Sequence, residues 1–171
     1  MPLELDLSRY PVLVVDDEQD NLDIVRFNFR KAHPLHFATS GAEALEVLKK
    51  EEIACIVSDQ RMPGMTGIEF LRAARELRRD TVNVLLTAYA DLPLLTEALN
   101  DGLAYRYVSK PWNSEELGLA LRGAIERYHL LRENRRLVEL LSAQNARLER
   151  EAHEEFNFGE IVGNARSLER V

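Results

Sequence analysis

Polar side chains that could bind a metal or a phosphoryl group stand at the ends of apolar runs in this sequence. An acidic side chain at the end of a buried strand is costly unless it is paired or bound to a metal. A single aspartate in such a place is more often a turn or cap residue than a ligand. Here, however, the pattern repeats after successive runs, at Asp16 and Asp17, Asp59, Thr87 and Lys110. Taken jointly, these residues indicate a shared site.

The chemistry available to these residues is metal-assisted phosphoryl transfer. Three carboxylates in one cleft repel each other and favour a hard cation such as Mg²⁺, which binds carboxylate oxygens and keeps several waters. A carboxylate beside that ion can attack phosphorus and form an aspartyl phosphate. Thr87 could then donate its hydroxyl hydrogen, and Lys110 its ammonium hydrogens, to the oxygens of the product.

The elements that must position these residues are short apolar runs separated by amphipathic stretches. Helix-start signals lie between the runs: "SGAE" (40–43) and "TGIE" (66–69) match the capping-box pattern, and "NSEE" (113–116) offers Asn113 or Ser114 as a cap. Nearly continuous apolar strands that alternate with helices indicate a parallel sheet covered on both faces. The runs are "PVLVV" (11–15), "LHFAT" (35–39), "IACIVS" (53–58), "VNVLLT" (82–87) and "YRYVS" (105–109).

The expected fold class is α/β, a flavodoxin-like doubly wound five-stranded parallel sheet with the strand order 2-1-3-4-5. Ligands bind at the carboxyl ends of the strands in sheets of this kind. In this order the first, third, fourth and fifth strands are neighbours, so the polar residues at their ends can converge. The second strand lies at the edge and carries no such group.

Length and composition indicate one globular domain with an appendage, or two small domains. Of the 171 residues, 46% are apolar and 30% are charged, and no apolar run approaches the roughly 18 residues of a membrane span. The N-terminus has no basic region typical of a secretion signal, and the single cysteine, Cys55, lies inside an apolar run, so we expect a cytoplasmic protein. The net charge of −7 argues against direct binding of nucleic acid.

A helical pattern begins at Ser114 and continues for about forty residues without proline, far beyond an ordinary helix of about a dozen. Such a length indicates a coiled coil, and we expect a parallel homodimer through it. Two heptad seams fit, and we favour the first beyond residue 130 because an asparagine at position a fixes a two-stranded register. The first seam has Arg127, Asn134, Leu141 and Leu148 at a with Leu130, Leu137 and Gln144 at d; the second has Leu131, Val138 and Asn145 at a with Asn134, Leu141 and Leu148 at d.

From about residue 10 to residue 127 the sequence resembles the receiver domain of bacterial two-component response regulators, which is a signalling domain and not an enzyme. The resemblance implies that Asp59 accepts phosphate from a sensor histidine kinase. It also implies that Asp16, Asp17 and Asp59 hold Mg²⁺ together with the backbone carbonyl of Arg61. The motifs that carry the resemblance are "VLVVDDE" (12–18), "IVSDQRMPGMTG" (56–67), "LLTAY" (85–89) and "YVSKPW" (107–112).

The same resemblance assigns roles near the phosphoryl group. Thr87 and Lys110 would contact that group, Thr87 and the aromatic Tyr107 would form a coupled switch, and the peptide bond before Pro111 would be cis. Gln60, Arg61 and Tyr89 depart from the commonest receiver pattern at positions that flank the expected phosphoryl pocket. "DQRMPG" with "NDGLAYRYVSKPW" is similar to a subgroup that includes hydrogenase-gene activators and receivers of cyclic-dinucleotide enzymes. An inverted response to phosphorylation occurs in that subgroup, so both signs stay open.

The last stretch, "FNFGEIVGNARSLERV" (156–171), resembles the opening of the AAA+ domain in NtrC-type activators of sigma-54 RNA polymerase. We therefore expect a receiver over 1–127, a coiled-coil dimerisation linker over 128–155, and the start of a truncated AAA+ output domain over 156–171. No phosphate-binding loop of the pattern G-x-x-x-x-G-K-[ST] follows, so the ATPase is absent from this chain. Sigma-54 RNA polymerase would be a partner through the missing output domain.

Two other functions fit parts of the sequence. The same receiver and helix could control a cyclic-dinucleotide or other non-transcriptional output, if the last residues are a generic linker. The chain could instead be a haloacid-dehalogenase-type phosphotransferase, which also uses an aspartyl nucleophile. That family requires the pattern D-x-D after its first strand, whereas Asp16 and Asp17 are adjacent and Gln19 stands at the relevant spacing. We reject the enzyme on that ground.

Overall fold

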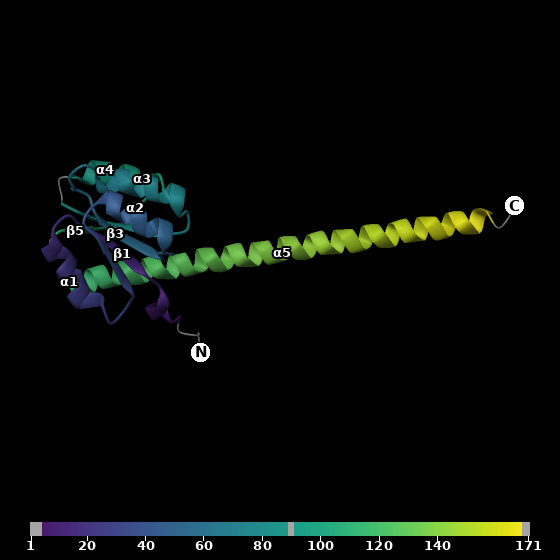
Figure 1. Ribbon diagram of the computed structural model, residues 1–171, viewed down its shortest axis with the longest axis horizontal. Coiled ribbons are helices and arrows are strands. Elements are labelled where there is room, and N and C mark those ends of the chain that lie inside the picture. The colour runs from purple at the N-terminus through teal and green to yellow at the C-terminus, as the bar shows by residue number, and fades with distance from the viewer. Residues whose placement is uncertain (1–4, 89–90, 169–171) are drawn as a thin grey trace. The chain divides into compact units, whose positions relative to one another are not determined.

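The computed structural model describes residues 5–88 and 91–168, with side chains up to residue 159 (Figure 1). The strands form one parallel sheet in the order β2-β1-β3-β4-β5, and a long helix ends the chain, so the predicted fold class is confirmed. The elements are η1 (Leu7–Arg9), β1 (Val12–Val15), α1 (Gln19–Phe29), β2 (Leu35–Ala38), α2 (Gly41–Lys50), β3 (Cys55–Asp59), α3 (Gly67–Leu77), β4 (Val82–Thr87), α4 (Leu92–Asn100), β5 (Arg106–Ser109) and α5 (Ser114–Leu168).

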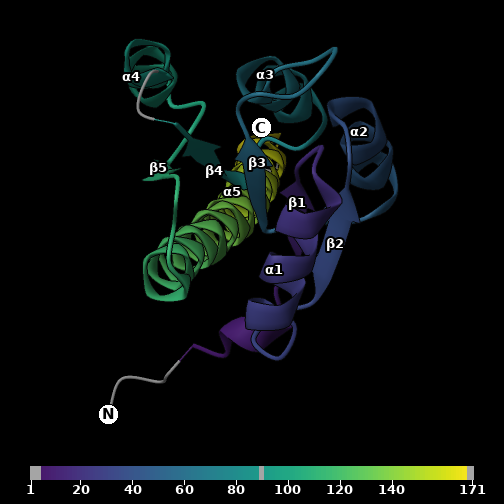
Figure 2. The same cartoon turned by 90° about the vertical axis from the view of Figure 1, so that its left-hand side faces the viewer.

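Helices cover both faces of the sheet, as Figure 2 shows for α1 and the start of α5 on one side and for α2 and α3 on the other. Alternate residues of each strand point to opposite faces, so Val12 and Val14 pack with α1 and α5, whereas Leu13 and Val15 pack with α2, α3 and α4. Every residue of β1, β3 and β4 is buried. The continuous apolar runs therefore reflect burial on two faces.

Polar side chains define the starts of the helices between the strands. Thr66 and Glu69 form the complete capping box that "TGIE" predicts for α3. Ser40 accepts a hydrogen bond from the Glu43 backbone N–H at the start of α2, but the Glu43 carboxylate turns to the backbone N–H and hydroxyl of Thr39. At the start of α5 the Asn113 side chain accepts from the Glu116 N–H, which selects Asn113 over Ser114 as the cap.

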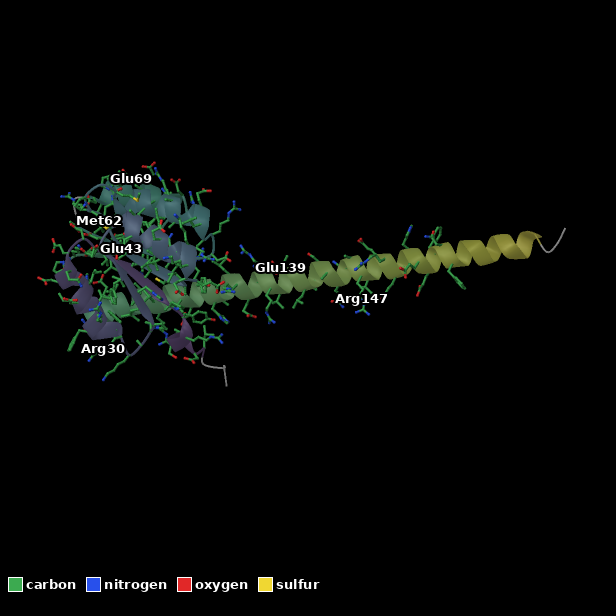
Figure 3. All side chains as sticks on the ribbon, in the orientation of Figure 1. Arg30, Glu43, Met62, Glu69, Glu139 and Arg147 are labelled. Carbon is green, nitrogen blue, oxygen red and sulfur yellow. The ribbon has the colours of Figure 1, made fainter. Side chains whose placement is uncertain are left out.

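The chain forms two compact units, one running to Leu131 and one starting at Arg132. Within the first unit α5 buries Leu117, Leu121 and Ile125 against the sheet. In the second unit the described side chains of α5 are exposed except for the half-buried Glu133, as Figure 3 shows for Glu139 and Arg147. No helix in the described part of the chain is long and apolar enough to cross a membrane.

The helix continues through residue 156 to Leu168 without a break, so the backbone marks no start of a new domain there. Residues 169–171, which complete the predicted AAA+ segment, lie outside the described residues. The three segments inferred from the sequence, and the two boundaries between them, stay predictions.

Candidate functional site

Three aspartates meet where β1 and β3 end. Asp16 directly follows β1, Asp17 comes next, and Asp59 is the last residue of β3. These strands are neighbours in parallel register, with Val15 paired to Ser58, so their carboxyl ends lie at the same edge of the sheet. One carboxylate oxygen from each aspartate lies within 4.8 Å of the others. Asp16 and Asp59 are buried, whereas Asp17 is exposed and leaves the cluster open to solvent.

The buried Asp16 carboxylate accepts two hydrogen bonds, and its surroundings change its pKa. Its carboxylate accepts hydrogen bonds from the Glu18 backbone N–H at 2.9 Å and from Asn21 Nδ2 at 3.1 Å. Burial raises the pKa of the Asp16 carboxyl above its usual range, and the charge of Asp59 raises it further. The hydrogen bonds from Glu18 and Asn21 and the charge of Lys110 act in the opposite direction on that pKa. The net result is a raised pKa, and burial is its largest cause.

This cluster fits a magnesium ion by the chemistry of its donors. Its ligands are carboxylate oxygens, which suit Mg²⁺, and the exposed Asp17 leaves room for the waters that this ion retains. A divalent cation would also relieve the repulsion between Asp16 and Asp59 that raises the Asp16 pKa.

Lys110 and Thr87 approach the cluster from the next two strands. Lys110 Nζ lies 3.0 Å from Asp59 Oδ1 and 3.7 Å from Asp16 Oδ2, so a single ammonium group bridges both carboxylates. Its backbone N–H donates to the Thr87 carbonyl oxygen at 2.8 Å, which joins the ends of β4 and β5. The buried Thr87 hydroxyl donates to the Ala88 carbonyl oxygen at 3.0 Å. The Lys110–Pro111 peptide bond is cis, as predicted.

The loop between β3 and α3 is tightly folded against Asp59. A Cβ atom on Gly67 would lie 2.4 Å from the Asp59 carbonyl oxygen, so this position requires glycine for close backbone approach. Gln60 directly follows Asp59, and its buried side chain accepts a hydrogen bond from the Ile68 N–H at 2.9 Å. Gln60 therefore ties the loop to the start of α3.

Tyr107 lies on β5, paired with Leu85, and its side chain is partly exposed at 38%. A groove beside it is lined by Leu99 of α4, by residues of β5, and by Glu116 and Leu119 of α5. Space for another position of the Tyr107 ring therefore exists next to the strand. Tyr89, the other aromatic residue noted in the sequence, lies outside the described residues.

Two side-chain contacts at this edge were missed by reasoning from the sequence. Arg61 was considered only for its backbone carbonyl, yet its side chain forms an ion pair with Asp91, the residue before α4. Asn21 donates to Asp16 from α1. An aspartate before "LPLL" suggests a helix cap, so the sequence carries no signal for the Arg61 contact.

Known proteins that are similar to this chain include one family and several regulatory proteins. Residues 12–122 match the model of the family described as "Response regulator receiver domain". Over 158 residues the chain is 32% identical to the hydrogenase transcriptional regulatory protein HoxA of Cupriavidus necator, an alignment that covers 88% of this chain and 33% of HoxA. It is also 32% identical over 127 residues to the C4-dicarboxylate transport transcriptional regulatory protein DctD of Rhizobium meliloti, covering 74% of this chain and 27% of DctD.

A solved structure titled as adenylate cyclase from Rhodopirellula baltica is similar as well. It has a TM-score of 0.75 and 31% identity, and the alignment covers 77% of this chain and 98% of that one. The chain thus spans about a third or less of the curated relatives HoxA and DctD.

Proposed function

Because the chain belongs to the response regulator receiver domain family, we propose that Asp59 is its phosphoacceptor and that a sensor histidine kinase supplies the phosphoryl group. The observation that carries the proposal is the meeting of Asp16, Asp17 and Asp59 with Lys110 at one edge of the sheet. A receiver of this kind is a signalling domain, whose phosphorylated state is its output.

The proposed step transfers the phosphoryl group to one oxygen of the Asp59 carboxylate. A P–O bond forms to Asp59 while the P–N bond to the kinase histidine breaks, and the leaving imidazole keeps the electron pair of that bond. Asp16, Asp17, Asp59 and the backbone carbonyl of Arg61 would hold Mg²⁺, which supplies positive charge to the phosphoryl oxygens when bound. Lys110, already 3.0 Å from Asp59, would add a second positive charge.

Thr87 and Tyr107 would change position when Asp59 is phosphorylated. The Thr87 hydroxyl now donates to the neutral Ala88 carbonyl, and a charged phosphoryl oxygen is a stronger acceptor. Its movement toward Asp59 would free space on the β5 side, where Tyr107 stands beside the groove between α4 and α5. Thr87→Ala should still be phosphorylated but should lose the amide shifts that the phosphoryl analogue beryllofluoride induces in α4 and β5. Full shifts in that variant would contradict the switch.

A parallel homodimer through α5 is proposed as the structural output of the receiver. Leu130, Leu137, Leu141 and Leu148 recur along α5 at heptad positions, and each is more than half exposed in a single chain. Isolated helices obtain most of their stability from packing of an apolar face, so a second copy is the partner that would cover these leucines.

The relatives named as transcriptional regulators support control of transcription as the role of the whole protein. We propose an NtrC-type activator in which the described helix leads to an AAA+ domain that acts on sigma-54 RNA polymerase.

The net charge of −7 gives this chain no excess of positive charge for nucleic acid. The cytoplasm is the proposed compartment, as for other receivers. The similarity to the adenylate cyclase structure keeps a cyclic-nucleotide output as the second candidate.

Labelling with a small phosphodonor tests the phosphoacceptor directly. The wild-type chain should gain one phosphoryl group from acetyl phosphate in the presence of Mg²⁺, as measured by intact-protein mass spectrometry, and should lose this reaction with a chelator. Asp59→Asn should remain unlabelled, and peptide mapping should place the group on Asp59. Equal labelling of Asp59→Asn would overturn the assignment.

A further inference from the structure

The guanidinium group of Arg61 crosses from the β3–α3 loop to the start of α4. Arg61 Nε donates to Asp91 Oδ2 at 3.2 Å, and Arg61 Nη2 donates to Asp91 Oδ1 at 3.3 Å, so the pair is bidentate. The Asp91 side chain is only 12% exposed, whereas that of Arg61 is 69% exposed. The carboxylate is thus fixed in place, and the arginine is the member that is free to leave.

Asp91 has a second possible partner in its own helix. It occupies the N-cap position of α4 but makes no side-chain cap hydrogen bond there, and its backbone angles of −96° and 8° differ from the extended conformation of most caps. Pro93 offers no N–H, so Leu94 supplies the N–H that a capping carboxylate would accept in this first turn. The carboxylate is therefore engaged by Arg61 in place of the helix.

Arg61 also has a second possible partner, at the phosphoacceptor. It lies two residues after Asp59, and its side chain is largely exposed, at 69%. A phosphoryl group on Asp59 would bring about −1.5 to −2 charges and three strong acceptor oxygens. A guanidinium matches two such oxygens with parallel hydrogen bonds, as it now matches the two oxygens of Asp91.

We propose that Arg61 is a second phosphoryl-binding cation beside Lys110, held away from the site by Asp91 until Asp59 is phosphorylated. The inference rests on the proposed function of Asp59. When Arg61 turns to the phosphoryl oxygens, Asp91 is released and can accept the Leu94 N–H as the cap of α4. The exchange gives the phosphoryl group a route to α4 that is separate from the Thr87 hydroxyl.

If Asp91 and the phosphoryl group compete for Arg61, substitutions of Asp91 and of Arg61 should change the affinity for a phosphoryl analogue in opposite directions. Asp91→Asn weakens the competitor while keeping an oxygen that can cap α4, so a larger fraction of Arg61 is free and the apparent affinity for a phosphoryl analogue should rise. Arg61→Gln removes the ligand, so the affinity should fall. Because the arginine is largely exposed, we expect about a threefold change in each direction. The double variant should behave like Arg61→Gln alone.

The test is a beryllofluoride titration of the full chain with saturating Mg²⁺. Binding is followed by the fluorescence of Trp112, the single tryptophan, which follows Pro111 in the loop after Lys110. Arg122→Gln is the matched control, because Arg122 also donates from Nε to a carboxylate, at 3.3 Å from Glu126, and is 67% exposed. The control should bind like the wild type. Thermal melts of the wild type and of the four variants establish that each variant is folded before its affinity is compared.

A second readout follows the side chain itself. The Arg61 Nε–Hε resonance should move on addition of beryllofluoride in the wild type, should already be shifted toward its free position in Asp91→Asn, and should not move in Asp59→Asn. An unmoved resonance in a wild-type chain that binds beryllofluoride would overturn the inference.

The outcomes separate this inference from the function on which it rests. If the wild-type chain shows no binding that depends on Asp59, the proposed function fails and the inference fails with it. If Asp59-dependent binding is normal but Arg61→Gln and Asp91→Asn change affinity in the same direction, or not at all, the ion pair is only structural and the inference alone is overturned.

Discussion

One helix, α5, passes through two regions, and only the first of them buries some of its leucines. In the first compact unit Leu117 and Leu121 are fully buried against the sheet. Beyond Arg132, Leu141 and Leu148 are exposed at 58% and 54%, and the contacts of their neighbours are exposed ion pairs such as Arg147 with Glu151 at 3.1 Å. Such pairs contribute only a few tenths of a kcal/mol each. Leucines of one helix therefore belong to a buried core in the first region and to an exposed surface in the second.

The same difference separates the edge of the sheet that carries Asp59 from the second region of the helix. Asp59 and Thr87 are positioned by strands buried on both faces, so their geometry is set within one chain. The proposed seam residues of α5 would acquire a defined environment only in the proposed dimer. The first region is therefore defined within one chain, whereas the second depends on the proposed association.

Truncating one leucine in each region should give the largest contrast. Leu121→Ala should lower the free energy of unfolding of the receiver by about 2–5 kcal/mol, because it leaves a cavity in the core. Leu148→Ala should change that free energy by less than about 0.5 kcal/mol, because its side chain contacts no core. Urea denaturation of the full chain, followed by Trp112 fluorescence at one protein concentration, measures both. Similar losses in the two variants would contradict the contrast.

Adding one methyl group to a glycine in each region should change stability in opposite directions. Gly67→Ala should cost about 1–3 kcal/mol, because the new Cβ would lie 2.4 Å from the Asp59 carbonyl oxygen and the loop would have to shift. Gly159→Ala meets no atom within 4 Å and should add helix stability of about 0.5–1 kcal/mol. Denaturation and far-UV circular dichroism test the two. A neutral Gly67→Ala would mean that the loop is not tightly constrained.

Charge placed on the proposed seam should weaken association. Leu141→Glu should raise the dissociation constant of the dimer at least tenfold, about 1.4 kcal/mol, because it puts a carboxylate in the apolar contact. Leu140→Glu is the matched control, since Leu140 is equally exposed at 56% but belongs to neither heptad seam. Sedimentation at micromolar concentration measures both variants. An unchanged Leu141→Glu, or an equal effect of Leu140→Glu, would rule out the proposed seams.

The smallest expected effect is the pH dependence of stability that His33 gives to the first region. Burial lowers the pKa of the His33 imidazole below its usual value, although the hydrogen bond of Nδ1 with the Leu7 carbonyl opposes this. The unfolded chain therefore binds a proton more readily, so stability is fully present above the unfolded pKa near 6.5 and is lost as the pH falls below it. His33→Gln should flatten this slope in denaturation curves between pH 7.5 and 5.5, about one unit either side of that pKa. An unchanged slope would exclude His33 as its source.

Much of the fold could be predicted from local pattern. Apolar runs of five or six residues between helix-start signals predict a parallel sheet, because only burial on both faces removes polar residues from a strand. The right-handed connections of such a sheet leave few strand orders, so the meeting of Asp16, Asp17, Asp59, Thr87 and Lys110 at one edge followed from the positions at which the runs end. Thr66 and Glu69, three residues apart, predicted the complete cap of α3 for the same local reason.

The tertiary structure decided the contacts between groups that are distant in sequence or that have several possible partners. The Glu43 carboxylate could accept a hydrogen bond from Ser40 or from Thr39. The Gln60 side chain could turn toward the pocket or toward α3. The Asp91 carboxylate could cap its own helix or pair with Arg61. Local spacing permits each alternative, and the choice depends on which donor the packed elements bring within hydrogen-bond distance. A side chain with one short-range partner can be placed from sequence, whereas a side chain for which two donors compete can be placed only when the distances between elements are known.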